Sequence, residues 1–178
     1  TNDRLGIGTT SPQERLHISG NLLIGKRDDV VGTWTKRSST TPGVITSGGT
    51  SGISSTTAMV VYNGSLYVGT MSTGGAEVYR YSGTNSTWTK VSSSTPGVIG
   101  DVGTTSIEAV SAMTVYNGHL YIGTKKTGGA EVYRYDGNST WTLLSSTTAG
   151  AIGGTATTTA INEISSMVVH NGYLYIGT

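Results

Sequence analysis

Residues 112–124 read AMTVYNGHLYIGT, and this stretch decides the class of fold. Two runs rich in β-branched and aromatic residues, 112–116 and 119–124, flank Asn117-Gly118. Asn-Gly between two such runs is the strongest short signal for a β-hairpin, because both turn residues tolerate a positive φ angle. Leu120 and Ile122 stand two residues apart, so they share one face of the second strand. The stretch therefore predicts an antiparallel hairpin.

This hairpin belongs to a long internal repeat. Residues 58–83 and 112–137 are identical at 20 of 26 positions. The turn recurs at steps of 54 residues, as Tyr62-Asn63-Gly64, Tyr116-Asn117-Gly118 and His170-Asn171-Gly172. The three tryptophans follow nearly the same period, at Trp34, Trp88 and Trp141. Such a period is too long for a coiled coil or a β-helix rung, and it suits a unit of four strands.

Each repeat divides into four expected strands. The hairpin gives the first two, and residues 130–135 and 140–144 give the third and fourth, joined by a tight turn at 136–139. A connection rich in Ser, Thr and Gly, residues 145–166, leads to the next repeat. This order is typical of a propeller blade. We predict an all-β fold, a β-propeller-like repeat of four-stranded antiparallel blades.

The composition excludes several classes of protein. Gly contributes 27 of the 178 residues, charged residues only 12%, and Cys is absent. A helical bundle needs far more Ala, Glu, Lys and Leu, and no apolar run approaches the roughly 18 residues of a membrane helix. The net charge of +1 comes without the basic stripe of a nucleic-acid-binding protein. We expect neither nucleic acid nor membrane insertion among the partners.

The repeat resembles the kelch family. Its diglycine, tyrosine and tryptophan positions are present twice, as Gly74, Gly75, Tyr79, Tyr81 and Trp88, and as Gly128, Gly129, Tyr133, Tyr135 and Trp141. The resemblance covers roughly residues 20–178 and implies a β-propeller whose Tyr and Trp side chains pack between blades. We therefore expect Trp88 and Trp141 to be largely buried. It implies no single activity, since such propellers serve mostly as binding scaffolds.

The segment Leu5–Asn21 carries a second resemblance. Its residues GIGTTSPQERLHISGN are similar to a segment common in phage tail-fibre and bacterial surface-fibre proteins. This resemblance implies a trimer and an extracellular location, on a virion or a cell surface. We expect residues 1–20 to be a leader for oligomerisation and residues 21–178 to form the blades.

The number of strands indicates incomplete blades at both ends. Residues 21–27 align with the third strand of a blade and residues 33–37 with the fourth, whereas residues 167–178 supply only a first and a second strand. Two functions remain open. One is a non-enzymatic fibre or adhesin component whose propeller binds a receptor or a glycan. The other is a structural protein that assembles into a filament or oligomer by strand complementation between chains.

No catalytic, cofactor or metal site is expected. The three histidines have no metal-ligand spacing. Glu77 and Glu131 are interpreted as partners of ion pairs or cross-strand contacts with Arg80 and Arg134. The sequence varies most in the loops between second and third strands and in the long connections, so we expect any ligand on that face. Its candidate residues are Met71, Ser72, Lys125 and Lys126.

Overall fold

The fold is all-β. The structure, a computed structural model, describes residues 5–7, 16–18, 35–46, 49–83, 87–153 and 160–178, and these contain strands but no helix. The chain divides into two compact bodies, Thr1–Lys36 and Arg37–Thr178. In the first body, β1 (Leu5–Ile7) pairs in parallel with β2 (Leu16–Ile18). The predicted strand 21–27 and Trp34 lie outside the described residues, and residues 35–37 are not in a strand.

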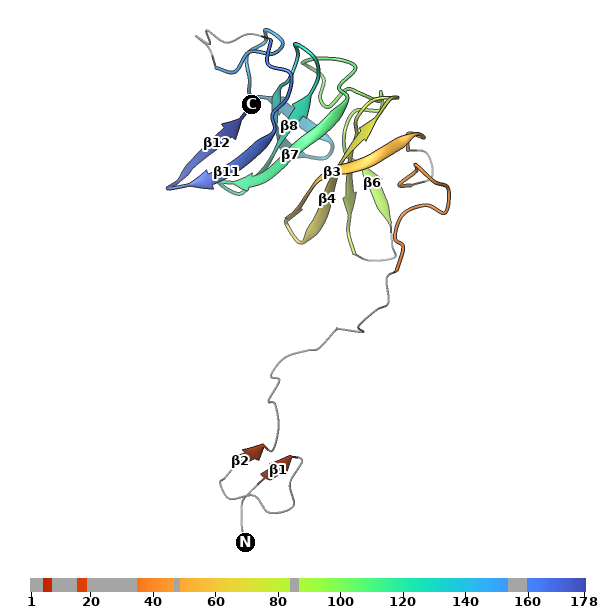
Figure 1. The fold of residues 1–178 in the computed structure, drawn as a ribbon, viewed down its shortest axis with the longest axis vertical. Helices are drawn as coiled ribbons and strands as arrows, with labels where there is room; N and C mark the ends of the chain where they lie inside the picture. Colours follow the sequence, from red (N-terminus) through yellow and green to blue (C-terminus); the bar gives the residue numbers. More distant parts are fainter. Residues whose placement is uncertain (1–4, 8–15, 19–34, 47–48, 84–86, 154–159) are drawn as a thin grey trace. The chain divides into compact units, whose positions relative to one another are not determined.

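The second body contains ten strands that follow the sequence repeat (Figure 1). Repeat 1 consists of β3 (Ile53–Tyr62), β4 (Ser65–Ser72), β5 (Val78–Tyr81) and β6 (Trp88–Lys90). Repeat 2 consists of β7 (Ala109–Tyr116), β8 (His119–Lys125), β9 (Val132–Gly137) and β10 (Thr140–Leu143). Repeat 3 is the hairpin β11 (Ser166–His170) and β12 (Tyr173–Gly177). The four strands predicted within residues 112–144 are confirmed, with small differences at their ends.

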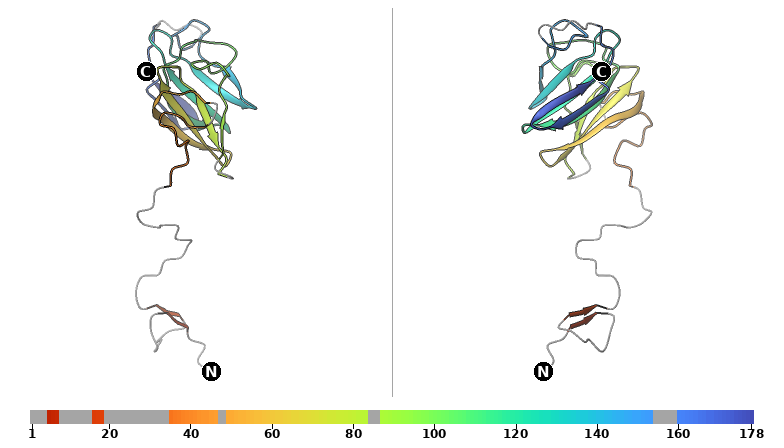
Figure 2. Two further views of the ribbon diagram at one scale, coloured as in Figure 1. Left: turned by 90° about the vertical axis from the view of Figure 1, so that its right-hand side faces the viewer. Right: turned by 60° about the vertical axis from the view of Figure 1, so that its left-hand side comes forward.

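Pairing follows the same pattern in both full repeats. Each strand is antiparallel to the next along the chain, β3-β4-β5-β6 and β7-β8-β9-β10. One pair of residues, Met71 and Ala109, joins β4 to β7 and links the eight strands into one curled sheet. The first strands of successive repeats lie side by side, β3 next to β7 and β7 next to β11 (Figure 2).

The hairpin turns have the backbone geometry that Asn-Gly predicts. Asn63, Asn117 and Asn171 have φ angles of 46°, 46° and 48°, and the glycine after each is positive as well. Asn accepts this left-handed conformation more readily than most residues, because its short polar side chain bonds locally. The turns therefore sit at the same end of each repeat and fix the register of the strands that follow.

The main core lies between repeats 1 and 2. Tyr67 and Val91 of repeat 1 pack with Leu120, Ile122 and Trp141 of repeat 2 in one buried cluster. The indole Nε1 of Trp141 donates to the Val91 carbonyl at 2.7 Å, and the side chain is only 7% exposed. The predicted burial of Trp141 is thus confirmed. Trp88 is only partly buried, because the described chain holds no complete repeat before it.

The long connections are as regular as the strands. Ile53, Ile107 and Ile161 each donate their backbone N–H to the carbonyl of a glycine in the same connection, at 3.1, 2.9 and 2.9 Å. Those glycines are Gly43, Gly97 and Gly150, and all three have positive φ angles. Although the sequence of the connections varies, their described backbone therefore repeats.

Candidate functional site

A hollow of about 350 Å³ lies between repeats 1 and 2, at the end that carries the Asn-Gly turns. β4 and β5 of repeat 1 form one side of it, and β8 and β9 of repeat 2 form the other. Its volume is within the range of small-molecule sites. The lining includes three tyrosines, two asparagines and three groups that can carry charge: Tyr62, Tyr67, Tyr135, Asn63, Asn138, Arg80, His119 and Asp136.

The three tyrosines form the apolar wall of this hollow, which we call the inter-repeat pocket. The Tyr67 ring centroid lies 5.7 Å from those of both Tyr62 and Tyr135, in tilted and edge-to-face arrangements. Tyr67 and Tyr135 are nearly fully buried. Burial and the neighbouring Tyr135 raise the pKa of Tyr67 above its ordinary value, although a hydrogen bond with Arg80 opposes the rise. The Tyr67 phenol therefore stays protonated at neutral pH.

Asp136 gives the pocket a fixed negative charge. Its Oδ1 accepts a hydrogen bond from Arg134 Nε at 2.7 Å, and its Oδ2 accepts one from the Thr142 hydroxyl. The hydrogen bonds from Thr142 and Arg134 hold the pKa of Asp136 below its ordinary value. Arg80 is the repeat-1 equivalent of Arg134, and it brings a guanidinium to the side of the pocket that repeat 1 forms. Donors and acceptors thus face one another across aromatic surface.

This combination suits a polyhydroxylated ligand. Planar charged and amide groups can make paired hydrogen bonds to hydroxyl groups, and tyrosine offers an apolar ring with a polar tip. The described residues contain no group of three His, Cys, Asp or Glu side chains placed to hold a metal ion. The pocket therefore has both the polar groups and the aromatic surface that binding of such a ligand requires.

The loop residues predicted to face a ligand lie at the other end of the strands. Met71 is 37% exposed, but Ser72 is buried, with its hydroxyl bonded to the Gly52 carbonyl at 3.2 Å. Lys125 forms an ion pair with Glu163 at 3.1 Å. The Lys126 backbone N–H donates to the Asn162 carbonyl at 2.9 Å. Ser72, Lys125 and Lys126 thus also hold the long connections.

The repeat residues of the kelch resemblance occupy equivalent structural positions. Tyr81 contacts Trp88 with ring centroids 5.0 Å apart, and Tyr135 contacts Trp141 at 4.8 Å. The diglycines begin the approach to the third strand. At Gly75 the φ angle is +113°, and a Cβ atom there would lie 2.6 Å from the Pro96 carbonyl carbon, so a side chain does not fit. The other diglycine positions are Gly74, Gly128 and Gly129.

An ion pair is confirmed for Glu77, but with Lys90 of the neighbouring strand, and the expected pairing of the two glutamates with Arg80 and Arg134 is wrong. Both carboxylates are fully buried. Glu131 accepts hydrogen bonds from the Tyr133 hydroxyl at 2.5 Å and from the Thr104 backbone N–H at 2.7 Å, whereas Arg134 pairs with Asp136.

Repeat 1 has the same arrangement, in which Glu77 accepts from the Tyr79 hydroxyl and from the Thr50 N–H at 3.2 Å, and also from Lys90 at 3.0 Å. Burial alone would raise the pKa of Glu77, but these hydrogen bonds outweigh it and hold the pKa below its ordinary value. Each glutamate therefore fastens a long connection to the third strand.

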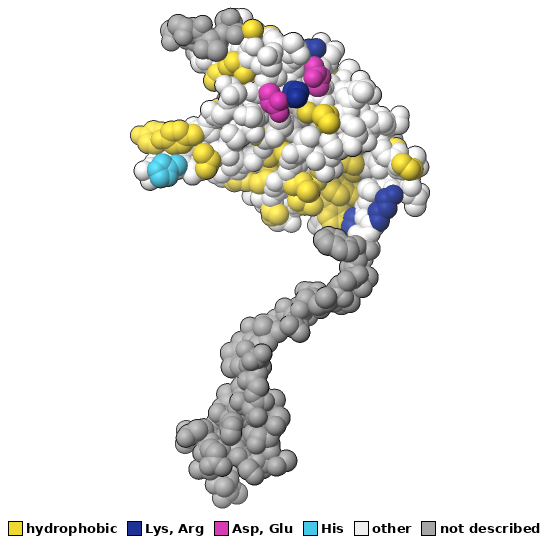
Figure 3. All heavy atoms as spheres, viewed as in Figure 1, with side chains coloured by type: hydrophobic (Ala, Val, Ile, Leu, Met, Phe, Trp, Pro, Cys, Tyr) yellow, Lys and Arg dark blue, Asp and Glu magenta, His cyan; other side chains and the backbone are white. Residues whose placement is uncertain are grey.

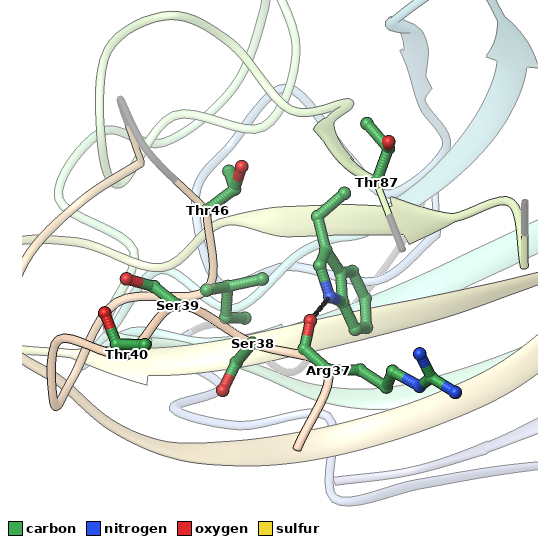
Figure 4. A pocket seen from close by; sticks show the side chains of 8 residues that line it. Arg37, Ser38, Ser39, Thr40, Thr46 and Thr87 are labelled. Atoms are coloured by element: carbon green, nitrogen blue, oxygen red, sulfur yellow. Dashed lines mark hydrogen bonds between the residues drawn. The ribbon is translucent and has the colours of Figure 1, made fainter. Parts of the chain in front are cut away.

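A second hollow, of about 470 Å³, lies on the outer side of repeat 1 (Figure 4). The Trp88 side chain borders it, and its Nε1 donates to the Arg37 carbonyl at 2.7 Å. Ser38, Ser39, Thr40, Ile45 and Thr46 complete most of the lining. Trp141 makes the equivalent bond to Val91 inside the core. The hollow beside Trp88 is therefore equivalent to the space beside Trp141, which repeat 1 fills.

Comparison with known proteins finds no match to any family model, curated protein or solved structure. Among the described residues, no helix has the length and apolar character needed to cross a membrane.

Proposed function

We propose that this chain is a non-enzymatic component of an extracellular fibre or adhesin, on a virion or cell surface, and that it binds a glycan or a glycan-bearing receptor. In this proposal, each repeat of four strands is one blade of a kelch-like β-propeller. The regular order of strands in repeats 1 and 2, with the first strands side by side, supports the blade interpretation.

The inter-repeat pocket is the observation that carries the binding function. Its volume suits a sugar residue or a short oligosaccharide, and its lining combines tyrosine rings with Arg80, Asp136 and two asparagines. Because the pocket is bordered by tight turns and buried tyrosines, little ordering of the protein is needed when a ligand enters. Pre-organisation of this kind increases the affinity that a small contact area can provide.

A glycan array followed by titration calorimetry tests this function. The full chain is screened, and the strongest glycan is then titrated against the Arg80→Ala and Asn138→Ala variants. We expect each variant to weaken binding by about tenfold, since each removes a hydrogen-bonding group from the pocket.

Lys126→Ala is the matched control, because it removes a charged side chain at the opposite end of the strands. Loss of binding in Lys126→Ala, with Arg80→Ala unchanged, would move the site to the loops between second and third strands. Absence of binding to every glycan on the array would contradict the proposed function.

A further inference from the structure

The same tyrosine position has three different exposures in the three repeats. Tyr67 is 3% exposed, Tyr121 is partly buried and Tyr175 is 51% exposed. Repeat 2 covers Tyr67 with a full set of strands, including Tyr135. The hairpin of repeat 3 covers Tyr121 only in part, and the described residues leave Tyr175 half exposed. The outer side of repeat 3 is thus the face to which a following repeat would dock.

Other apolar side chains accompany Tyr175 on this face. Val168 is 59% exposed and Tyr173 is 67% exposed. Hydrophobic side chains gather at the tip of the β11–β12 hairpin and over the β3–β4 hairpin (Figure 3). We call Val168, Tyr173 and Tyr175 the trailing face. Exposed apolar groups gathered on one sheet face are typical of an interaction site.

The outer side of repeat 1 has the residues that repeat 2 uses against repeat 1. Met59, Leu66 and Trp88 correspond to Met113, Leu120 and Trp141 at steps of 54, 54 and 53 residues. Leu120 and Trp141 are buried in the core between repeats, and Met113 packs against it. Met59, by contrast, is 62% exposed, and Trp88 borders the open hollow of Figure 4. We call Met59, Leu66 and Trp88 the leading face.

Polar contacts at the junctions repeat in the same way. The Thr57 hydroxyl donates to the Val110 carbonyl of repeat 2 at 2.6 Å, and the Ser111 hydroxyl donates to the Ile164 carbonyl of repeat 3 at 2.8 Å. Ser165 is the next residue of this series. Its hydroxyl is placed alike, 3.2 Å from the Gly177 carbonyl, and is exposed where a following repeat would lie.

The glycine at the end of each second strand leads to the same conclusion. A Cβ atom on Gly69 would lie 2.6 Å from the Val110 Cβ, and one on Gly123 would lie 2.5 Å from the Ile164 Cβ. Both glycines thus accommodate a branched side chain of the next repeat. Gly177 is equivalent, but the three atoms nearest to its Cβ position belong to Ser165 and Ser166 of its own repeat. No side chain of another repeat is among these three atoms.

We propose that the trailing face of one chain docks on the leading face of a second copy, in the register that joins repeats 1 and 2. The occupant is a second copy because repeat 1 carries, position by position, the surface already seen docked within the chain. Two different faces of one chain meet in this contact, so copies associate head to tail and form a closed ring or an open filament. The proposal is independent of glycan binding, since the inter-repeat pocket lies within one chain.

Size-exclusion chromatography with light scattering tests the proposal on the full chain. We expect the mass of a dimer or a larger species, and we expect Tyr175→Glu and Met59→Glu each to shift the chain to a monomer. Both side chains are exposed, so far-UV circular dichroism should show both variants folded. Val102→Glu is the matched control, because Val102 is 62% exposed but lies on neither face. This control should assemble like the parent chain.

Mixing the two glutamate variants gives the decisive result. Each retains one intact face, so an equimolar mixture should form a dimer through one trailing and one leading face. A parent chain that is monomeric overturns the proposal, as does assembly that survives both substitutions. Two variants that assemble separately but not with each other would also overturn it. If the variants are monomeric and their mixture stays monomeric, the two faces do not bind each other and the proposal fails.

Discussion

Replacing Trp141 by Ala measures how much the junction between repeats contributes to stability. Trp141 is 7% exposed, its ring centroid lies 4.8 Å from that of Tyr135, and its Nε1 donates to the Val91 carbonyl at 2.7 Å. Loss of a buried tryptophan costs about 3–5 kcal/mol, of which a neutral hydrogen bond accounts for about 1 kcal/mol. We therefore expect Trp141→Ala to lower the free energy of unfolding by about 3–5 kcal/mol.

Urea unfolding followed by far-UV circular dichroism is the assay, because fluorescence itself depends on the tryptophans. Trp88→Ala is the matched control, since Trp88 makes the same hydrogen bond, to the Arg37 carbonyl, but is only partly buried. Both variants are measured in the Tyr175→Glu background, which removes the proposed contact between chains. We expect Trp88→Ala to lose less than half as much stability. Equal losses, or a loss below about 1 kcal/mol for Trp141→Ala, would refute the argument that burial by the neighbouring repeat decides the cost.

Two further predictions concern the buried tyrosines and a close backbone approach. Burial and the hydrogen bonds to glutamate raise the pKa of Tyr79 and Tyr133 above their ordinary value of 10.0, so the unfolded chain releases these protons first. The stability that they contribute is complete below pH 10 and is lost as the pH rises further, and urea midpoints measured against pH should show a decline that the double Phe variant lacks. Gly69→Ala places a Cβ atom 2.6 Å from the Val110 Cβ and should cost about 1–3 kcal/mol. Gly74→Ala, whose nearest contact is a methyl group at 3.3 Å, should change urea stability by less than about 0.5 kcal/mol.

Local signals in the sequence predicted most of the strands. Asn117-Gly118 and the runs around it determine a hairpin within about a dozen residues, and the structure places β7 and β8 there. The repeat then carried that assignment to 58–83 and to the last hairpin. The difference between Trp88 and Trp141 could not be predicted in this way. Their sequence positions are equivalent, and their burial depends on whether another repeat lies beside them.

The buried carboxylates and the inter-repeat pocket depend on contacts distant in sequence. Glu131 accepts a hydrogen bond from the backbone N–H of Thr104, which lies 27 residues earlier in the chain. Every residue except proline has this N–H, so the residue type at position 104 does not predict the contact. The recurrence of Gly49-Thr50 as Gly103-Thr104 was the available signal, because a Cβ on Gly103 would lie 2.8 Å from the Glu131 carboxylate. The pocket likewise combines side chains of two repeats. The sequence pattern within one repeat does not predict which of its side chains meet those of the next repeat.

The regular junction also has a consequence for how this chain changes in evolution. Thr57 and Ser111 reach the following repeat through equivalent hydrogen bonds, and residues 58–83 and 112–137 are nearly identical. Unequal crossing-over between the matching stretches of coding DNA therefore adds or removes a whole period of 54 residues and creates no new kind of junction. Changes of another length fit in turns or connections, as the 53-residue step from Trp88 to Trp141 shows, where they leave contacts such as that of Gly69 with Val110 in place. Array length is thus a heritable property that one genetic event can alter while every contact surface stays the same.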